Sequence, residues 1–275
     1  MSLSVILPAH DEAGYLGDCL EALLRSDCAA LEIIVIANAC GDATADVARG
    51  FARKAAQRGW RLEVIETPLG GKLNALNLGD GAATGAARVY LDADVIVSAP
   101  LIGQIAAALT GDAPRYAGGT ARIARADSGV TRAYGRFWVT LPFVTQGAPG
   151  FGLFAVNAAG RARWGAFPDI ISDDTFVRLH FAPGERVQVR ASYTWPMVEG
   201  FANLVRVRRR QNAGVAELAR KHPALLANDS KSGVGLAGLM RRLLRDPTGF
   251  AVYGAVALAV KTPLFASKSR WARGR

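Results

Sequence analysis

The stretch Val89-Tyr-Leu-Asp-Ala-Asp-Val95 reads as a short apolar strand that ends in two aspartates, Asp92 and Asp94. Alternate side chains of a strand share one face, so this spacing predicts two carboxylates that point the same way. Two such carboxylates repel each other unless a cation lies between them, and Mg²⁺ or Mn²⁺ prefers oxygen ligands of this kind. From the spacing alone, a turn with both aspartates in solvent is an equally good interpretation.

Strands and helices alternate in the chain before this stretch. Strands are expected at residues 4–7, 32–36, 62–65 and 88–91, and helices over 13–25, 43–58 and 73–86. This alternation predicts an α/β fold with a parallel, doubly wound sheet. Ligands bind such sheets beyond the carboxyl ends of the strands, which is where His10, Asn38 and Asp92 fall. We therefore expect these three side chains to line one crevice.

The composition favours a folded domain with an anionic partner. The chain has 275 residues, 51% hydrophobic and 20% charged, which suits one large α/β domain or a domain with an appendage. A formal net charge of +10 favours a phosphate-bearing ligand, an anionic membrane surface or nucleic acid. Cys19, Cys28 and Cys40 form no CxxC pair and no cluster with the histidines, so we expect a reducing compartment and no structural zinc. A strand at the N-terminus predicts no cleavable signal peptide and a cytoplasmic protein.

Five motifs follow one another in a recognisable order. They are Val5-Ile-Leu-Pro-Ala-His-Asp-Glu12, Glu32-Ile-Ile-Val-Ile-Ala-Asn-Ala-Cys-Gly-Asp-Ala-Thr44, Gly71-Lys-Leu-Asn-Ala-Leu-Asn-Leu-Gly79, Asp92-Ala-Asp94 and Asp173-Asp174. Together they resemble the inverting family 2 glycosyltransferases, over roughly residues 3–215. The resemblance implies a Rossmann-like GT-A fold, with a mostly parallel central sheet flanked by helices, that binds a nucleotide-diphospho-sugar. It implies a catalytic domain over residues 1–215 and a basic, helical C-terminal extension over residues 216–275.

The same resemblance assigns a donor site. Asp94, with Asp92 beside it, would hold the divalent cation, and Lys72 at a helix N-terminus would add positive charge for the diphosphate. His10 stands where the family has an aromatic residue that packs on the base. The remaining expected donor contacts come from Pro8, Glu12, Asn38 and Asp42. Three plainer interpretations stay open: a surface lysine, a loop histidine, and Asp42 as the N-cap of the helix over 43–58.

A second set of residues is expected to serve the acceptor. Inverting transfer needs a carboxylate that deprotonates the acceptor hydroxyl, and the resemblance assigns this role to Asp174, with Asp173 in support. Asp173 could instead cap a helix over 175–180. Phe151 and Gly152 are expected to wall the acceptor site, as is Trp164 unless it only packs in the core. His180 and His222 are either metal ligands or structural residues, the latter being the commoner case.

The chain departs from the processive members of this family. Val207-Arg-Arg-Arg-Gln211 stands where those synthases carry Gln-x-x-Arg-Trp, which argues against polymer synthesis but leaves Arg210 able to contact the diphosphate. Ala37-Asn38 replaces the usual pair of aspartates after the second strand. This replacement leaves the base of the nucleotide open.

The C-terminal segment predicts contact with a membrane surface. Residues 234–246 place leucines and Met240 on one helix face and Arg241, Arg242 and Arg245 on the other, as in surface-bound helices. Residues 249–260 are uncharged but too short to span a bilayer. Peripheral attachment at the cytoplasmic face is therefore favoured, with packing of both helices on the catalytic domain as the alternative. Nucleic-acid binding is not expected, because no recognition module appears.

These observations favour a metal-dependent, inverting glycosyltransferase that moves a single sugar to a hydroxyl acceptor. The acceptor would be a lipid-linked or cell-envelope glycan, or a small metabolite. Two rival functions are a nucleotidyltransferase on a similar sheet and a non-catalytic module that binds a nucleotide-sugar or a membrane. The first lacks a Gly-rich loop after strand one, and the second has no use for the carboxylate of Asp174.

Overall fold

The computed structural model describes residues 2–230, 233–263 and 265, and the chain divides into two compact units. The first unit contains the residues up to Arg122, Gly150–Asp169 and His180–Trp195, and the second contains Ile123–Pro149, Ile170–Leu179 and the chain from Pro196 onward. The boundary expected at residue 215 falls inside helix α10 (Phe201–Lys221). The two units therefore do not follow the expected division into residues 1–215 and 216–275.

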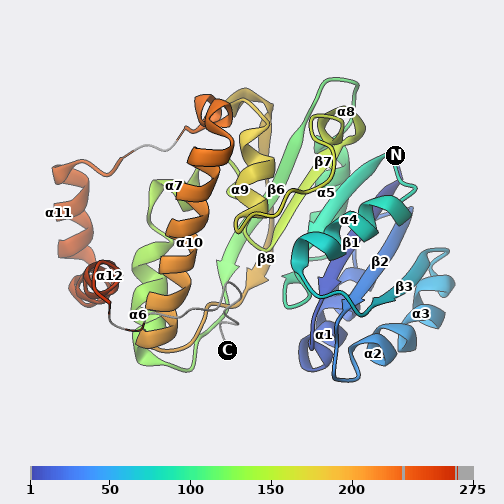
Figure 1. The fold of residues 1–275 in the computed structure, drawn as a ribbon, viewed down its shortest axis with the longest axis horizontal. Coiled ribbons are helices and arrows are strands. Elements are labelled where there is room, and N and C mark those ends of the chain that lie inside the picture. Colours follow the sequence, from blue (N-terminus) through green and yellow to red (C-terminus); the bar gives the residue numbers. More distant parts are fainter. Residues whose placement is uncertain (1, 231–232, 264, 266–275) are drawn as a thin grey trace. The chain divides into compact units, whose positions relative to one another are not determined.

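Within the described residues, the first unit is built on an eight-stranded sheet with the order β3-β2-β1-β4-β7-β6-β8-β5 (Figure 1). The strands are β1 (Leu3–Ala9), β2 (Leu31–Asn38), β3 (Arg61–Thr67), β4 (Ala87–Leu91), β5 (Ile96–Val97), β6 (Tyr116–Ile123), β7 (Leu153–Asn157) and β8 (Arg186–Trp195). Strands β1 to β4 pair in parallel, which confirms the sheet predicted from the sequence. Strand β7 pairs antiparallel with β4 and β6, and β5 pairs antiparallel with β8.

The helices of the first unit alternate with its strands along the chain. They are α1 (Ala13–Leu24), α2 (Thr44–Gly50), α3 (Ala52–Gln57), α4 (Lys72–Ala82), α5 (Pro100–Ala108) and α8 (Ala158–Arg161), with a 3-10 turn η1 (Pro183–Glu185). The single helix expected over 43–58 is instead α2 and α3, which meet at Phe51. Helix α4 ends before the expected residue 86, because the Thr84 amide bonds the Glu32 carboxylate and the Gly85 amide bonds Ser4 Oγ.

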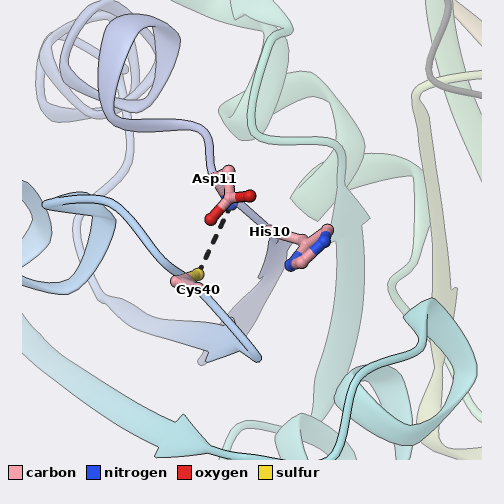
Figure 2. A group of neighbouring side chains, drawn as sticks. All are labelled: His10, Asp11 and Cys40. Carbon is pink, nitrogen blue, oxygen red and sulfur yellow. Dashed lines mark hydrogen bonds between the residues drawn. The ribbon is translucent and has the colours of Figure 1, made fainter.

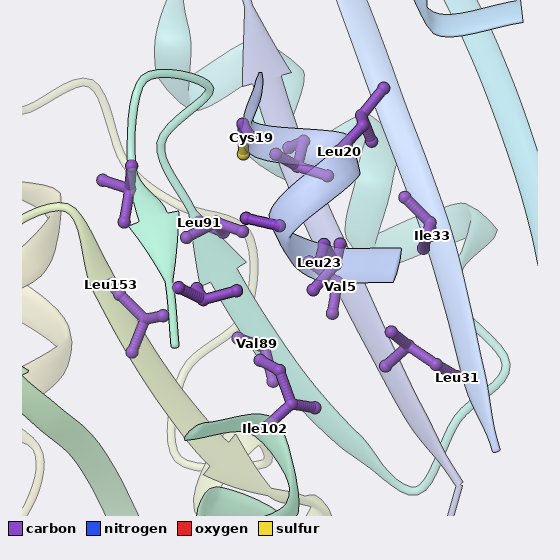
Figure 3. Close-up of a cluster of buried hydrophobic side chains, with 14 of the residues drawn as sticks. Val5, Cys19, Leu20, Leu23, Leu31, Ile33, Val89, Leu91, Ile102 and Leu153 are labelled. Carbon is purple, nitrogen blue, oxygen red and sulfur yellow. The ribbon is translucent and has the colours of Figure 1, made fainter. Parts of the chain in front are cut away.

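Alternating side chains of the parallel strands are buried on both faces of the sheet. On one face, Val5 and its register partner Ile33 pack under Leu20 and Leu23 of α1 (Figure 3). On the other face, Ile6 lies so close to Gly79 of α4 that a Cβ there would come within 2.4 Å of Ile6 Cγ2. Burial on both faces explains why β1 and β2 are continuous apolar runs rather than alternating ones.

Glu32 is a buried carboxylate at the start of β2. It accepts hydrogen bonds from Ser4 Oγ at 2.6 Å, the Thr84 amide at 2.9 Å and Arg61 Nη1 at 2.5 Å. Burial raises the pKa of Glu32, but these hydrogen bonds outweigh burial and hold the pKa below its usual range. The carboxylate therefore joins β1, β2, β3 and the segment that follows α4.

Replacing Glu32 with glutamine is expected to lower the free energy of unfolding by about 2 to 3 kcal/mol at pH 7, because charge-assisted hydrogen bonds are lost. A depressed pKa stabilises the fold at pH values above the unfolded-state pKa, and this contribution disappears as the pH falls through the folded-state pKa. Urea unfolding at pH 7 and at acid pH measures both effects. Glu63→Gln, which removes the other carboxylate on Arg61, is the control and is expected to cost less. Equal stability of Glu32→Gln and wild type at pH 7 would contradict this role.

The second unit is helical. Its elements are α6 (Gly129–Trp138), α7 (Pro142–Thr145), α9 (Asp173–Leu179), α10, the 3-10 turn η2 (Pro223–Asn228), α11 (Leu236–Arg245) and α12 (Pro247–Ala259). Helices α12 and α6 are held together by aromatic pairs, with ring centroids 4.8 Å apart for Phe137 and Tyr253 and 5.7 Å apart for Phe137 and Phe250. Within the described part of the chain, no helix combines the length and apolar character that a membrane crossing needs.

Candidate active site

Asp92 and Asp94 lie in a turn directly after β4, which is one of the two interpretations that their spacing allowed. The Asp92 carbonyl accepts a hydrogen bond from the Val95 amide at 3.1 Å, which closes the turn. Burial nevertheless alternates through it, because Ala93 and Val95 are buried while both aspartates are partly exposed. Both aspartates are therefore partly open to solvent at the end of β4.

Lys72 is the first residue of α4 and lies beside Asp92. Its Nζ is 2.8 Å from Asp92 Oδ1, and the side chain is only 21% exposed, so it is not a solvated surface lysine. The preceding Gly71 is the N-cap residue, with φ 126°, a conformation that glycine adopts without strain. The N-terminus of α4 also carries the positive end of the helix dipole. This corner of the first unit thus combines two positive features with the Asp92 carboxylate.

Asn38 is buried at the end of β2 and holds the neighbouring loops in place. Its Nδ2 donates to the Ala9 carbonyl at 2.6 Å, and its Oδ1 accepts from the Gly71 amide at 3.0 Å. Its own carbonyl lies 2.8 Å from His10 Nδ1. Asn38 therefore fixes the turn that starts α4 and orients His10, while its expected contact with the donor stays a prediction.

His10, Asp11 and Cys40 come together from the loops after β1 and β2 (Figure 2). One donor atom from each residue lies within 4.8 Å of the other two. The expectation that no cysteine clusters with a histidine is thus wrong, because the parallel pairing of β1 and β2 brings distant loops together. The Asp11 amide donates to Cys40 Sγ at 3.5 Å, and Asp11 Oδ1 accepts from the Gly41 amide at 2.6 Å. These bonds make the cluster a junction between the two loops.

Asp42 and Glu12 belong to the same junction. Asp42 Oδ2 accepts from the Ala13 amide at 3.1 Å, its Oδ1 accepts from the Thr44 amide at 3.0 Å, and the Glu12 amide donates to Thr44 Oγ1 at 2.8 Å. Burial raises the pKa of Asp42, but the hydrogen bonds from Thr44 and Ala13 outweigh it, so the pKa lies below its usual range. Asp42 is not the N-cap residue, because Ala43 holds that position in α2.

Pro8 lies near the carboxyl end of β1, where the strand pairs only with β2. The register pairs Pro8 with Ile36, whereas pairing with β4 stops at Ile6. The end of β1 therefore projects past β4 on the side where His10 follows. Among the donor-site residues predicted from the sequence, Pro8, His10, Asn38, Lys72 and Asp92 all lie at this edge of the sheet of the first unit.

Phe151 and Gly152 lie directly behind the aspartate turn. The Asp92 amide donates to the Gly152 carbonyl at 2.9 Å. Gly152 has φ 74°, and a Cβ on it would come within 2.6 Å of Trp195 Cδ1, so no larger residue fits. The ring of Phe151 lies 5.2 Å from that of Trp195. A wall of aromatic side chains thus stands next to the aspartates in the first unit.

Three residues of this region were missed by the sequence analysis. Trp195 and Tyr193 end β8, and Tyr193 donates its hydroxyl to the Phe151 carbonyl at 2.7 Å. Cys19 lies behind the turn, with Sγ 3.9 Å from the Asp92 carbonyl. Burial raises the pKa of the Cys19 thiol far above its usual range, and the Asp92 carboxylate raises it further, so the thiol stays neutral. The aromatic run Tyr-Thr-Trp at residues 193–195 is the sequence signal that could have indicated Tyr193 and Trp195.

Asp173 and Asp174 are the first residues of α9 in the second unit. The helix begins two residues earlier than expected, so Asp173 is helical instead of capping a helix from Thr175. Asp173 is buried, whereas Asp174 is partly exposed and accepts a hydrogen bond from the Thr175 amide at 2.6 Å. Of the two carboxylates, Asp174 is the one that solvent reaches more easily.

Two of the three consecutive arginines at positions 208–210 of α10 contact the C-terminal part of the second unit. Arg208 donates to the Tyr253 hydroxyl at 3.2 Å, and Arg209 donates to the Thr262 carbonyl at 2.6 Å, so both hold α12 and the segment after it. Arg210 follows them in α10 and is partly exposed. Its expected contact with the diphosphate stays a prediction.

The remaining candidate residues pack against aromatic rings. In the first unit, the ring of Trp164 lies 5.9 Å from that of Phe167 and 5.5 Å from that of His180. In the second unit, the ring of His222 lies 5.2 Å from that of Phe176. These contacts favour the structural interpretation of Trp164 and of both histidines.

Comparison with known proteins identifies the family. The sequence model of the glycosyl transferase family 2 matches residues 4–162. The chain belongs to this family. A curated relative, the uncharacterized glycosyltransferase EpsJ of Bacillus subtilis (strain 168), is 29% identical over 99 residues, which are 36% of this chain and 28% of EpsJ. The match thus spans little more than a quarter of that relative.

Solved structures of glycosyltransferases share the fold. Mannosyltransferase PcManGT from Pyrobaculum calidifontis, solved with GDP-Man and Mn²⁺, superposes with a TM-score of 0.60 and 22% identity over 95% of this chain and 76% of that chain. TarS residues 1–349 from S. aureus, solved with UDP, superposes with a TM-score of 0.55 and 14% identity over 95% of this chain and 91% of that chain. This chain therefore has the GT-A fold expected from its motifs, and the family match does not support the alternative of a nucleotidyltransferase.

Proposed function

We propose that this glycosyltransferase moves a single sugar from a nucleotide-diphospho-sugar to a hydroxyl acceptor, with inversion at the anomeric carbon. The observation that carries the proposal is the 2.8 Å contact of Lys72 Nζ with Asp92 Oδ1 at the N-terminus of α4. A departing nucleoside diphosphate gains negative charge, and fixed positive charge at this position stabilises it. The neighbours PcManGT and TarS, which were solved with GDP-Man and UDP, support a donor of this class.

Asp92 and Asp94 fit a divalent cation. Both offer only oxygen donors, both are partly exposed, and they stand two residues apart in the turn after β4. Two carboxylates leave most of the coordination shell to water and phosphate oxygens, which suits Mg²⁺ or Mn²⁺. When bound, the ion would neutralise the diphosphate of the donor. The Mn²⁺ in the PcManGT complex supports this choice of metal.

Asp174 is the proposed general base. Its carboxylate takes the proton of the acceptor hydroxyl as the oxygen attacks the anomeric carbon and the bond to the diphosphate breaks. Its partial exposure at the start of α9 suits a group that meets an incoming acceptor. The proposed acceptors are a lipid-linked or envelope glycan or a small metabolite, met in the cytoplasm or at the cytoplasmic face of the membrane.

A thermal-shift panel of UDP, GDP, CDP and dTDP, each with and without Mn²⁺, tests the donor site. One nucleotide is expected to raise the melting temperature by about 5 °C at roughly 100 times its dissociation constant, and only with the metal present. Asp94→Asn should remove the metal-dependent part, while Asp112→Asn, an exposed aspartate of the same unit, should retain it. The absence of a shift with all four nucleotides would contradict the proposed site.

A further inference from the structure

Helix α11 of the second unit exposes a row of large apolar side chains. Leu236, Met240 and Leu244 are 83%, 53% and 78% exposed. Residues four apart lie on one face of a helix, so the three side chains form a single ridge along α11. None of the residues of α11 is buried. Neighbouring large apolar side chains at this exposure mark an interaction surface more often than isolated ones do.

The opposite face of α11 is fixed by polar contacts to the segment after α6. Arg242 Nη2 donates to the Thr140 carbonyl at 2.7 Å, and its Nε donates to Thr140 Oγ1 at 3.1 Å. The sequence places Arg242 on the helix face opposite the leucines and Met240, and the structure gives this arginine a partner within the second unit. Arg242 is the inward anchor, and the exposed ridge faces away from the contacts that hold the helix.

A polar joint between α11 and α12 fixes this orientation. Asp246 Oδ1 accepts from the Gly249 amide at 2.9 Å, which caps α12. Its Oδ2 also lies 3.3 Å from Arg136 Nε of α6. These contacts tie the C-terminal half of α11 to α12, to α6 and to the segment after α6, and they leave Leu236, Met240 and Leu244 exposed.

Positive charge borders the apolar ridge. Arg241 and Arg245 are exposed, and each follows a ridge residue, Met240 or Leu244, directly in sequence. Neither α11 nor α12 contains an acidic residue, and Asp246 between them is paired with Arg136. Leu258 of α12 is a further exposed apolar side chain, at 67%. The exposed charged side chains of α11 are therefore both cationic, and they adjoin the apolar ridge.

We propose that α11 docks on an anionic lipid membrane, with Leu236, Met240 and Leu244 inserted at the level of the headgroups and acyl chains. Arg241 and Arg245 would contact lipid phosphates. A convex ridge with a cationic border suits a fluid, anionic surface, which needs no complementary groove. The docking does not depend on the donor or on the identity of the base, so it can be tested apart from the proposed enzymatic function.

Co-sedimentation of the full chain with vesicles tests this proposal. The protein is expected to bind phosphatidylcholine vesicles that contain phosphatidylglycerol and to bind pure phosphatidylcholine much more weakly. The triple variant Leu236→Ala, Met240→Ala, Leu244→Ala should lose more than about tenfold in vesicle affinity, because its apolar side chains are removed. Alanine keeps the helix propensity of α11, and circular dichroism verifies that the variant folds. The matched control Leu78→Ala, Val215→Ala, Leu226→Ala, at 37%, 38% and 37% exposure, should bind like wild type.

Substitution of the exposed arginines of α11 tests whether positive charge contributes to vesicle binding. Arg241→Gln and Arg245→Gln are each expected to weaken binding to the anionic vesicles roughly fivefold, and added salt should do the same. Arg53→Gln and Arg220→Gln, two exposed arginines elsewhere, should have little effect. Equal vesicle binding by wild type and the apolar triple variant would overturn the proposal. Absence of wild-type binding, or a concentration-dependent dimer that the triple variant abolishes, would overturn it as well.

Discussion

Asp174→Asn is expected to leave donor binding intact and to reduce turnover by about 10²- to 10⁴-fold, the range typical of a lost general base. The amide has nearly the same size as the carboxylate but cannot accept a proton from the acceptor hydroxyl. The start of α9 should tolerate the change, because the side-chain amide of the variant still offers an oxygen to the backbone N–H of Thr175.

The measurement compares kcat with the dissociation constant of the donor, obtained by calorimetry. Asp173→Asn is the matched control, since Asp173 is adjacent but buried. It is expected to alter stability more than turnover. If turnover survives in Asp174→Asn, the assignment of the base is wrong. A larger loss of turnover in Asp173→Asn, with folding retained, would move the role to that neighbour.

Asp94→Asn is expected to lower kcat/KM by at least about 100-fold, because it removes a carboxylate from the proposed metal site. Its neighbour Asp92 is held by Lys72, so a change at position 94 leaves that ion pair in place. The loss should therefore appear as a higher Mn²⁺ concentration needed for half-maximal activity, and not as unfolding.

Titration of activity with Mn²⁺ separates these effects. Asp112→Asn, an exposed position in the loop between α5 and β6, should behave like wild type. Lys72→Gln should instead weaken binding of the donor diphosphate at every metal concentration, because it removes a fixed charge. An Asp94→Asn enzyme with wild-type activity and metal dependence would exclude Asp94 as a ligand.

The parallel sheet of the first unit was predictable from the order of residues. Apolar runs such as 32–36, separated by amphipathic helices, have few other ways to bury both faces. The ends of the strands then determine where polar residues gather, which is why His10, Asn38 and Asp92 were expected at one edge. The ends of the helices were less predictable. Phe51 divides a helix that looks continuous in sequence, and long-range bonds from Glu32 and Ser4 end α4 early.

The candidate site was predictable in its residue types and less so in its geometry. The spacing of Asp92 and Asp94 predicted either a shared strand face or a turn, and the structure has a turn in which burial alternates. Asn38 was expected to contact the donor, but the structure shows its amide joining the Ala9 carbonyl to the Gly71 amide. Such bonds link residues that are distant in sequence, so no local pattern indicates them.

The sequence by itself determined the family, the parallel strands and the acidic motifs, because periodicity, turn residues and short motifs are local properties of the chain. Only the tertiary structure decided which polar groups meet. It placed Lys72 against Asp92, gathered His10, Asp11 and Cys40, and turned Arg242 inward to Thr140. Those choices depend on contacts between segments far apart in the chain. A buried or half-buried polar group takes whichever partner the packed elements bring to it.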